Sequence, residues 1–265
     1  MSALLEVEQL AKRFGGLMAV KDVSFALAAG EITGILGPNG AGKTTLFNLI
    51  TGFTQPDAGQ IRFDGRSVAG LAPHRIVHLG MARTFQLPRP FHGMTVAENV
   101  AVACVAAARR GGGVRVRDRA EQILREVGLA DQASAPVEIL PYGDLRRLEI
   151  ARALATTPRL VLLDEPFAGL GAGEIQPLAA LIRRLHAGGL TILIIEHKLR
   201  EMMRLVRRVI ALDFGAIIAE GAPEAIAKKS RADKGRPHKK AGVQTPPNSS
   251  TVIDTVPVPN IGLRP

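Results

Sequence analysis

The chain of 265 residues has very little cysteine. Its single thiol, Cys104, excludes an internal disulfide, so the protein cannot be a disulfide-stabilised scaffold. Cys104 lies in a stretch rich in alanine and valine, which predicts a buried and inert thiol rather than a reactive one. Hydrophobic residues make up 46% of the chain, enough for one large core or two closely packed subdomains.

Long hydrophobic runs are also missing. No stretch approaches the roughly 20 apolar residues that span a bilayer, and the longest candidates are residues 100–108 and 190–195. The first residues place the acidic Glu6 where a signal peptide would have a basic segment followed by a long apolar run. We therefore expect a cytoplasmic protein that reaches a membrane only through a partner.

Acidic residues are outnumbered, which gives a net charge of +10. Residues 228–265 hold eight Lys/Arg against two Asp, so +6 arises there and +4 remains for residues 1–227. This basic, proline-rich segment has neither helical nor alternating periodicity, which predicts a disordered tail. A solvated extension, attraction to anionic lipid and attraction to nucleic acid phosphates all remain open for it.

Glycine is well represented, and one glycine-rich segment carries chemical meaning. Residues 32–36 are typical of a short buried strand, and residues 44–50 of an apolar-periodic helix. Between them lies the phosphate-binding pattern G-x-x-x-x-G-K-[ST], formed by Gly37, Pro38, Asn39, Gly40, Ala41, Gly42, Lys43 and Thr44. Such a loop wraps an anion with backbone N–H groups, while its lysine reaches the β- and γ-phosphates and its Thr ligates Mg²⁺. The segment predicts binding of a nucleoside triphosphate.

The pattern along the chain predicts an α/β fold. Alternation over residues 4–25 indicates antiparallel strands, and residues 73–135 indicate a helical insert with a joint at 110–113. Afterwards helices alternate with strands of Val, Ile and Leu, which is typical of a parallel sheet covered on both faces. We expect helices at 96–108, 120–127, 145–155, 174–186 and 198–207, strands at 61–63, 160–163 and 191–195, and a hairpin turning at 213–215.

A second chemical element follows the predicted strand 160–163, where Asp164 and Glu165 stand side by side. In nucleotide hydrolases the first of two such carboxylates holds Mg²⁺, often through water, and the second orients or deprotonates the attacking water. Successive side chains of an extended chain point to opposite sides, so one carboxylate can face the metal and the other the nucleophile.

The segment 140–154 completes a series of motifs that resembles the nucleotide-binding subunits of ABC transporters. The series contains the phosphate loop, Gln86, a signature-like loop at 140–144, the Asp164–Glu165 pair, and His197 after the strand 191–195. Within the family, the chain looks most like the ATPases of branched-chain amino acid importers. Three phrases carry that likeness: Arg83-Thr84-Phe85-Gln86, Leu148-Glu149-Ile150-Ala151-Arg152 and Phe167-Ala168-Gly169-Leu170.

The resemblance implies a P-loop NTPase core with a mainly parallel sheet, an N-terminal antiparallel β subdomain and an inserted helical subdomain. It implies an ABC domain over residues 1–227, with the helical subdomain at about 87–158 and the tail at 228–265. Members hydrolyse ATP with Mg²⁺, as two subunits that enclose two ATP molecules. Their partners are a transmembrane permease, a second ATPase subunit of the same or another kind, and indirectly a solute-binding protein, at the inner face of the cell membrane.

The resemblance also implies residue roles. Glu165 is the catalytic base, His197 contacts the γ-phosphate, Gln86 senses that phosphate, and Thr44, Gln86 and Asp164 surround the metal. The implied nucleotide contacts are the phosphate loop, Phe14 against the adenine, Thr45, Tyr142 and Gly143. Alternatives stay open: Phe14 as a core residue of the first sheet, Gln86 and His197 as surface residues, and Arg146, Arg147 and Arg152 as an exposed helix face.

The chain departs from the family pattern in its signature-like loop. Pro141 replaces the usual serine and brings neither a hydroxyl nor an N–H, Tyr142 replaces a glycine, and Asp144 replaces a glutamine. We expect Gly143 and a helix start at Leu145 to keep part of the role. Gly171 stands where an aspartate or asparagine is usual, and the resemblance ends near residue 226.

Two other functions remain in view. A soluble ABC ATPase that acts on nucleic acid would use the basic tail as its anchor, but the chain has neither a repeated phosphate loop nor sustained heptads. Nucleic acid is therefore the less favoured partner. A regulatory ATP-binding protein with little turnover is suggested by Pro141 and Gly171.

Overall fold

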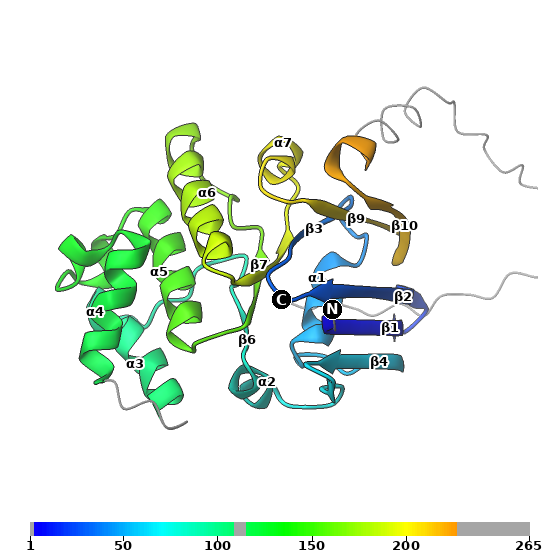
Figure 1. Ribbon diagram of the computed structural model, residues 1–265, viewed down its shortest axis with the longest axis horizontal. Helices are drawn as coiled ribbons and strands as arrows, with labels where there is room; N and C mark the ends of the chain where they lie inside the picture. The colour runs from blue at the N-terminus through cyan, green and yellow to red at the C-terminus, as the bar shows by residue number, and fades with distance from the viewer. Residues whose placement is uncertain (1–2, 109–114, 227–265) are drawn as a thin grey trace, which may run out of the picture.

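The computed structural model describes residues 3–108 and 115–226 (Figure 1). Its helices are α1 (Lys43–Ile50), α2 (Pro73–Leu79), α3 (Val96–Ala108), α4 (Val116–Val127), α5 (Tyr142–Ala155), α6 (Ala172–Ala187) and α7 (Leu199–Met203), with 3-10 turns η1 (Ala130–Gln132) and η2 (Val137–Ile139). Its strands are β1 (Ala3–Phe14), β2 (Leu17–Ala28), β3 (Ile32–Leu36), β4 (Ala58–Phe63), β5 (Arg66–Ser67), β6 (Met81–Arg83), β7 (Leu160–Asp164), β8 (Thr191–Ile195), β9 (Arg208–Asp213) and β10 (Ala216–Gly221). The predicted tail and the joint at 110–113 lie outside the described residues.

The strands form two sheets. A four-stranded sheet in the order β2-β1-β4-β5 is antiparallel throughout, which confirms the prediction for the first residues. A six-stranded sheet has the order β10-β9-β3-β8-β7-β6, in which only β10 is antiparallel to its neighbour. The predicted α/β class, with a mainly parallel sheet and an antiparallel sheet before the phosphate loop, is confirmed.

Both faces of the six-stranded sheet are buried. In β7 the side chains of Val161 and Leu163 join one hydrophobic cluster, whereas those of Leu160 and Leu162 join the other. The first cluster contains residues of α3 to α6, and the second contains residues of α1 and of the antiparallel sheet. Full burial stabilises each such leucine by about 1.5–3 kcal/mol. The strand ends that carry the polar side chains are therefore anchored from both sides.

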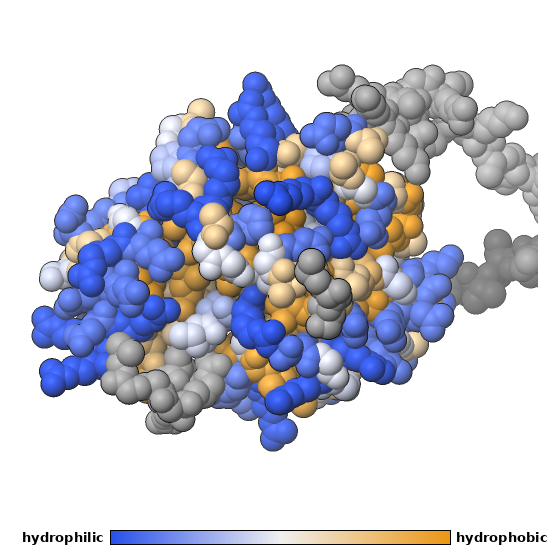
Figure 2. All heavy atoms as spheres, viewed as in Figure 1, coloured by the Kyte–Doolittle hydropathy of each residue, from blue (hydrophilic) through white to orange (hydrophobic). Residues whose placement is uncertain are grey.

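Helices α3, α4 and α5 pack against one another at the left of Figure 1. Helix α4 buries Ala120, Ile123, Leu124 and Val127, and Figure 2 shows mostly hydrophilic side chains on the face over it. Cys104 of α3 is buried as predicted, and its burial raises the pKa of the thiol, which disfavours the reactive thiolate. No helix among residues 3–108 and 115–226 is long and apolar enough to cross a bilayer.

Several expected element boundaries are wrong, and three of them lie next to predicted site residues. Residues 81–83, placed in the helical insert, form the edge strand β6, whose three residues are too few to show a period. Helix α5 begins at Tyr142 rather than at Leu145, because the Pro141 carbonyl accepts the N–H groups of Asp144 and Leu145 and so starts the first turn early. Helix α7 ends at Met203 rather than at 207, since the N–H of Arg207 already bonds the Ile32 carbonyl in β3.

Candidate functional site

The predicted site residues leave the sheet at one edge. The phosphate loop follows β3, Gln86 follows β6, Glu165 follows β7 and His197 follows β8. These strands are parallel, so their carboxyl ends lie on the same side, and the order β3-β8-β7-β6 makes the four loops neighbours. Ligands of open α/β sheets bind at this edge.

The phosphate loop depends on glycine at two close approaches. Gly42 has a φ of 97°, and a side chain there would collide with the Ala19 carbonyl of β2. A Cβ at Gly37 would collide with the Leu212 carbonyl of β9. Because the backbone lies against both strands, the loop is held in place, and α1 begins directly after it with its first N–H groups free of helical partners.

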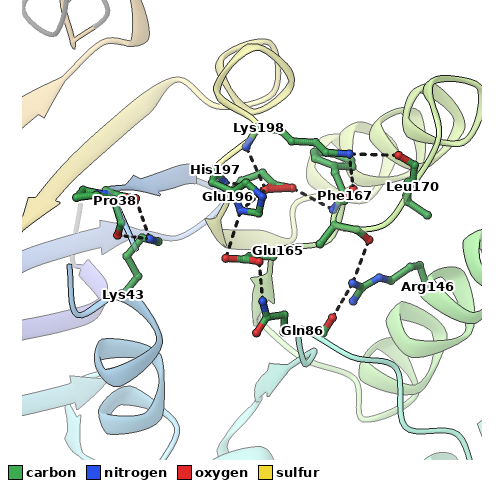
Figure 3. A network of polar contacts seen from close by, with 12 residues as sticks. Pro38, Lys43, Gln86, Arg146, Glu165, Phe167, Leu170, Glu196, His197 and Lys198 are labelled. Atoms are coloured by element: carbon green, nitrogen blue, oxygen red, sulfur yellow. Dashed lines mark hydrogen bonds and ion pairs between the residues drawn. The ribbon is translucent and has the colours of Figure 1, made fainter. Parts of the chain in front are cut away.

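The Lys43 side chain lies inside the phosphate loop and bonds the loop backbone. Its Nζ donates to the Gly37 and Pro38 carbonyls at 2.8 Å each, and the residue is 6% exposed (Figure 3). Burial lowers the pKa of Lys43, while Glu165 and Asp164 oppose that shift. The Lys43 ammonium and the two carboxylates therefore interact electrostatically. An ammonium fixed in this way can stabilise the negative charge that develops on a reacting phosphate.

The rest of the loop and the first turn of α1 are more open. Pro38, Asn39 and Gly40 are exposed at the loop tip, and Ala41 is buried beneath it. Thr44 is exposed and Thr45 half-buried. The Thr44 hydroxyl is therefore accessible from solution at the first turn of α1.

Asp164 is tied to α1 through Arg83. The Arg83 guanidinium donates to Asp164 Oδ2 at 2.7 Å and to Asn48 Oδ1 of α1 at 2.6 Å. Both members of the ion pair are buried, and burial raises the pKa of Asp164 while Arg83 opposes the shift. Arg83 was quoted only as part of a motif, so sequence reasoning missed this role.

Glu165 lies between the other two predicted catalytic residues. Gln86 Nε2 donates to Glu165 Oε2 at 2.9 Å, and His197 Nδ1 is 3.3 Å from Glu165 Oε1 (Figure 3). The geometry expected for the carboxylate pair is wrong in one respect. Asp164 ends β7, and Glu165 turns out of the strand with a φ of 49°, so a turn rather than strand alternation separates the two carboxylates. A non-glycine residue held there stores strain, which is common at functional sites.

Phe14 stands at the end of β1 and is 50% exposed. The alternative in which it fills the core of the first sheet is wrong, because the ring faces solvent. The Lys12 Nζ lies 5.5 Å from the ring centroid, and the remaining face can stack on a base.

Tyr142 and Gly143 do not join the phosphate loop within this chain. They form the first turn of α5, and Figure 1 shows α5 and α1 on opposite sides of β7. The Tyr142 ring lies against Gly169 and within 5.1 Å of the Arg146 guanidinium, while Gly143 faces Glu174. Two predicted nucleotide contacts are thus separated from Lys43.

Arg146 corrects the expectation of an exposed arginine face on α5. It is 2% exposed, and its guanidinium bonds the carbonyls of Phe85 and Gln86. Arg147 and Arg152 are partly exposed. The signal that could have revealed Arg146 is Glu149, an opposite charge three residues further along the same helix, since Glu149 is buried beside it.

Glu196 and Lys198, on either side of His197, were also missed. Glu196 is fully buried and accepts the N–H groups of Phe167 and His197 at 3.1 and 2.8 Å. Lys198 Nζ donates to the Phe167 and Leu170 carbonyls at 2.8 and 3.2 Å. These bonds join the loop after Glu165 to the loop that carries His197. A carboxylate directly after a fully buried strand is the sequence feature that could have revealed Glu196.

Comparison with known proteins decides the family. Residues 20–168 match the family described as ABC transporter. The chain is 41% identical over 237 residues to the high-affinity branched-chain amino acid transport ATP-binding protein BraF of Pseudomonas aeruginosa, covering 84% of this chain and 93% of that protein. The chain belongs to the ABC transporter family of ATP-binding proteins. The predicted family is therefore confirmed.

Two further matches place the chain within this ABC family. The lipopolysaccharide export system ATP-binding protein LptB of Acidithiobacillus ferridurans is 38% identical over 226 residues, covering 85% of this chain and 93% of that protein. The solved ADP conformation of MJ1267, an ATP-binding cassette of an ABC transporter, is 32% identical with a TM-score of 0.78, covering 88% of this chain and 96% of that one. The ABC protein described here is a nucleotide-binding ATPase of the P-loop class.

Proposed function

We propose that this ABC ATPase drives uptake of branched-chain or related amino acids through a separate permease, at the cytoplasmic face of the cell membrane. BraF supports the solute class, because it matches this chain over nearly its whole length. The observation that carries the hydrolytic role is Glu165, which is held by Gln86 and His197 in the electrostatic environment of Lys43.

Glu165 is the general base in this proposal. A carboxylate that accepts a hydrogen bond from Gln86 and has the His197 imidazole 3.3 Å away is already oriented for the proton of an attacking water. His197 contacts the γ-phosphate. Gln86 senses the same phosphate, so the position of the segment that follows Gln86 depends on whether that phosphate is present. Lys43 and the first N–H groups of α1 stabilise the negative charge that accumulates on the phosphates.

Mg²⁺ fits the oxygen atoms at this edge of the sheet. Magnesium in nucleotide sites is held by one or two protein oxygens together with substrate phosphates. Thr44 offers an accessible hydroxyl, and the buried Asp164 carries a carboxyl whose raised pKa shows that nearby positive charge does not fully offset its burial. We assign Thr44, Asp164 and the Gln86 side-chain oxygen to the ion, which would neutralise phosphate charge.

Two subunits are needed for a complete site. Within one chain the first turn of α5 lies apart from the phosphate loop, so Tyr142 and Gly143 are free to meet the nucleotide of a second subunit. The N–H groups of Tyr142 and Gly143 precede the first helical hydrogen bond of α5 and lie at the positive end of its dipole. Pro141 lacks an N–H, but its carbonyl starts the helix early and so puts the N–H groups of Tyr142 and Gly143 at the tip.

The permease docks, in this proposal, beside Gln86. Phe53, Leu87 and Phe91 are 53%, 66% and 41% exposed, although all three are large and apolar. A cavity of about 230 Å³ is lined in part by Phe85 and Arg152, which contact the Phe53 and Phe91 rings. Exposed apolar side chains around such a cavity are typical of a protein interface. A cytoplasmic segment of the permease seated there would contact the loop that carries Gln86.

The hydrolytic role is tested with Glu165→Gln in the chain assembled with its permease. Loss of the base should slow Mg-ATP turnover by about 10² to 10⁴-fold and leave the Kd for ATP unchanged. Glu121→Gln, an exposed residue of α4, is the matched control and should hydrolyse ATP at the normal rate. Wild-type turnover at the background level, or full activity of Glu165→Gln, would contradict the proposal.

The solute class needs its own measurement, because LptB, at a similar identity, belongs to a lipopolysaccharide export system. Proteoliposomes that contain this chain, its permease and the solute receptor should take up leucine, isoleucine or valine when ATP is enclosed. ATP turnover without uptake of any of these amino acids would retain the ATPase and reject the importer.

A further inference from the structure

Arg146 joins two segments that flank Glu165. Its Nη1 donates to the Phe85 carbonyl at 3.0 Å, and its Nη2 donates to the carbonyls of Gln86 and Ala168 at 2.6 and 3.3 Å. Figure 3 shows the side chain reaching from α5 toward the backbone of Gln86. One guanidinium thus holds the segment before Gln86 and the loop after Glu165 at the same time.

Glu149, one turn further along α5, completes this clamp. Its Oε1 accepts the Phe85 N–H at 2.5 Å, and its Oε2 lies 3.6 Å from Arg146 Nη1. The backbone of Phe85 is therefore bonded on both sides by charged side chains of the same helix. Since Gln86 is the next residue and donates to Glu165, a movement of α5 is passed to the catalytic carboxylate through these bonds.

Arg146 is also close to the tip of α5. Tyr142, in the first turn, lies within 5.1 Å of the guanidinium, and Gly143 follows it. In the proposed dimer this tip meets the nucleotide that the partner subunit binds. Arg146 therefore lies between a contact to one nucleotide and the catalytic group that acts on the other.

We propose that Arg146 is a positioning residue that couples the two nucleotide sites: α5, docked on the partner's nucleotide, sets Gln86 and Glu165 of its own chain through the Arg146 clamp. This inference rests on the proposed function, in particular on the two-subunit site. It predicts an effect in cis, because the clamp acts on the Glu165 of the same chain. A purely structural contribution to the α5 tip would act in trans, on the nucleotide of the other subunit.

Mixed dimers separate these two cases. Two differently tagged copies of the chain are assembled on the permease, and Glu165→Gln in one copy leaves a single active site. The cis dimer carries Arg146→Gln in the copy with the intact Glu165. The trans dimer carries Arg146→Gln in the same copy as Glu165→Gln. The reference dimer has no change at Arg146.

The cis dimer should turn over ATP about 10- to 100-fold more slowly than the reference, with the same ATP concentration at half-maximal rate. The trans dimer should stay within about twofold of the reference. Equal slowing in cis and trans, or no slowing in cis, overturns the proposal. Background-level turnover of the dimer with two intact Glu165 residues would instead reject the proposed function.

A second variant protects the test against a folding defect. Arg146→Lys keeps a positive charge beside Glu149, but one ammonium cannot reach three carbonyls in the way that the planar guanidinium does. It should show the same cis slowing, and melting curves establish that it folds. Arg147→Gln, a partly exposed neighbour paired with Asp144 at 3.3 Å, is the matched control and should be neutral in both arrangements.

Discussion

Replacing Arg83 by methionine should destabilise the protein by leaving Asp164 buried without its counter-charge. The side chains of this ion pair are 6% and 4% exposed, and Arg83 also bonds Asn48 of α1 and Thr51, which caps that helix. Breaking a buried ion pair by removing one partner costs about 3–5 kcal/mol. For a domain of this size each kcal/mol lowers Tm by about 2–4 °C, so we expect a fall of about 6–20 °C.

The loss should depend on pH with a definite sign. Burial already holds the pKa of Asp164 above its ordinary value, and Arg83 is the main group that opposes this. A carboxyl with a pKa higher in the folded than in the unfolded state binds its proton more tightly when folded. Its contribution to stability is therefore present at low pH and lost as pH rises through the folded pKa. Arg83→Met removes the charge that opposes this shift, so the pKa of Asp164 in the folded protein rises further. The free energy of unfolding that the variant loses should therefore be larger at about pH 8 than at about pH 5.

The double variant Arg83→Met with Asp164→Asn is the internal control. It removes both charges and should regain about 2 kcal/mol or more of the loss, because no uncompensated carboxylate remains. Urea unfolding followed by circular dichroism at the two pH values gives the free energies. A single-variant cost below about 1 kcal/mol, or a double variant no more stable than the single one, would refute the reasoning.

Two predictions concern the nucleotide. Lys43→Ala should abolish ATP binding in calorimetry, because it removes the buried ammonium that contacts the phosphates. The control Lys21→Ala, at an exposed position, should bind ATP normally. If Lys43→Ala still binds ATP, the phosphate loop is not the site. Phe14→Ala should weaken ATP binding by about 2- to 10-fold, the value of one lost aromatic contact. It should leave Tm nearly unchanged because Phe14 is half exposed, and a lower Tm with unchanged affinity would show that the ring is structural.

Local sequence patterns predicted the sheet and its chemical edge well. Asp164 ends β7 and His197 lies two residues after β8, two strands made almost entirely of aliphatic residues, and the loop that leads to Lys43 follows the buried strand β3. A strand of that kind must be buried on both faces, and parallel neighbours put their carboxyl ends together. The positions of these side chains therefore followed from the strands together with the phosphate-loop pattern, the carboxylate pair and the family resemblance.

Long-range bonds between loops could not be predicted in the same way. For Arg146 the sequence offered only the alternative of an exposed helix face, because arginine on a helix is usually solvated. Its burial depends on carbonyls of Phe85, Gln86 and Ala168, which lie about 20 to 60 residues away in the chain. The left-handed backbone of Glu165 is equally invisible, since only tertiary contacts hold a glutamate in that conformation.

The central position of β3 has a consequence for synthesis of the chain. Its ladder partners are β8 and β9, whose residues begin only at 191 and 208, whereas β3 ends at 36. A ribosome that adds 5–20 residues per second needs roughly 8 to 30 s to cover the distance from β3 to β8. Throughout that interval β3 has no strand to pair with, so the nascent chain cannot yet present a rigid cradle for triphosphate. Nucleotide can therefore stabilise the chain only when its synthesis is nearly complete. It cannot direct the early steps of folding.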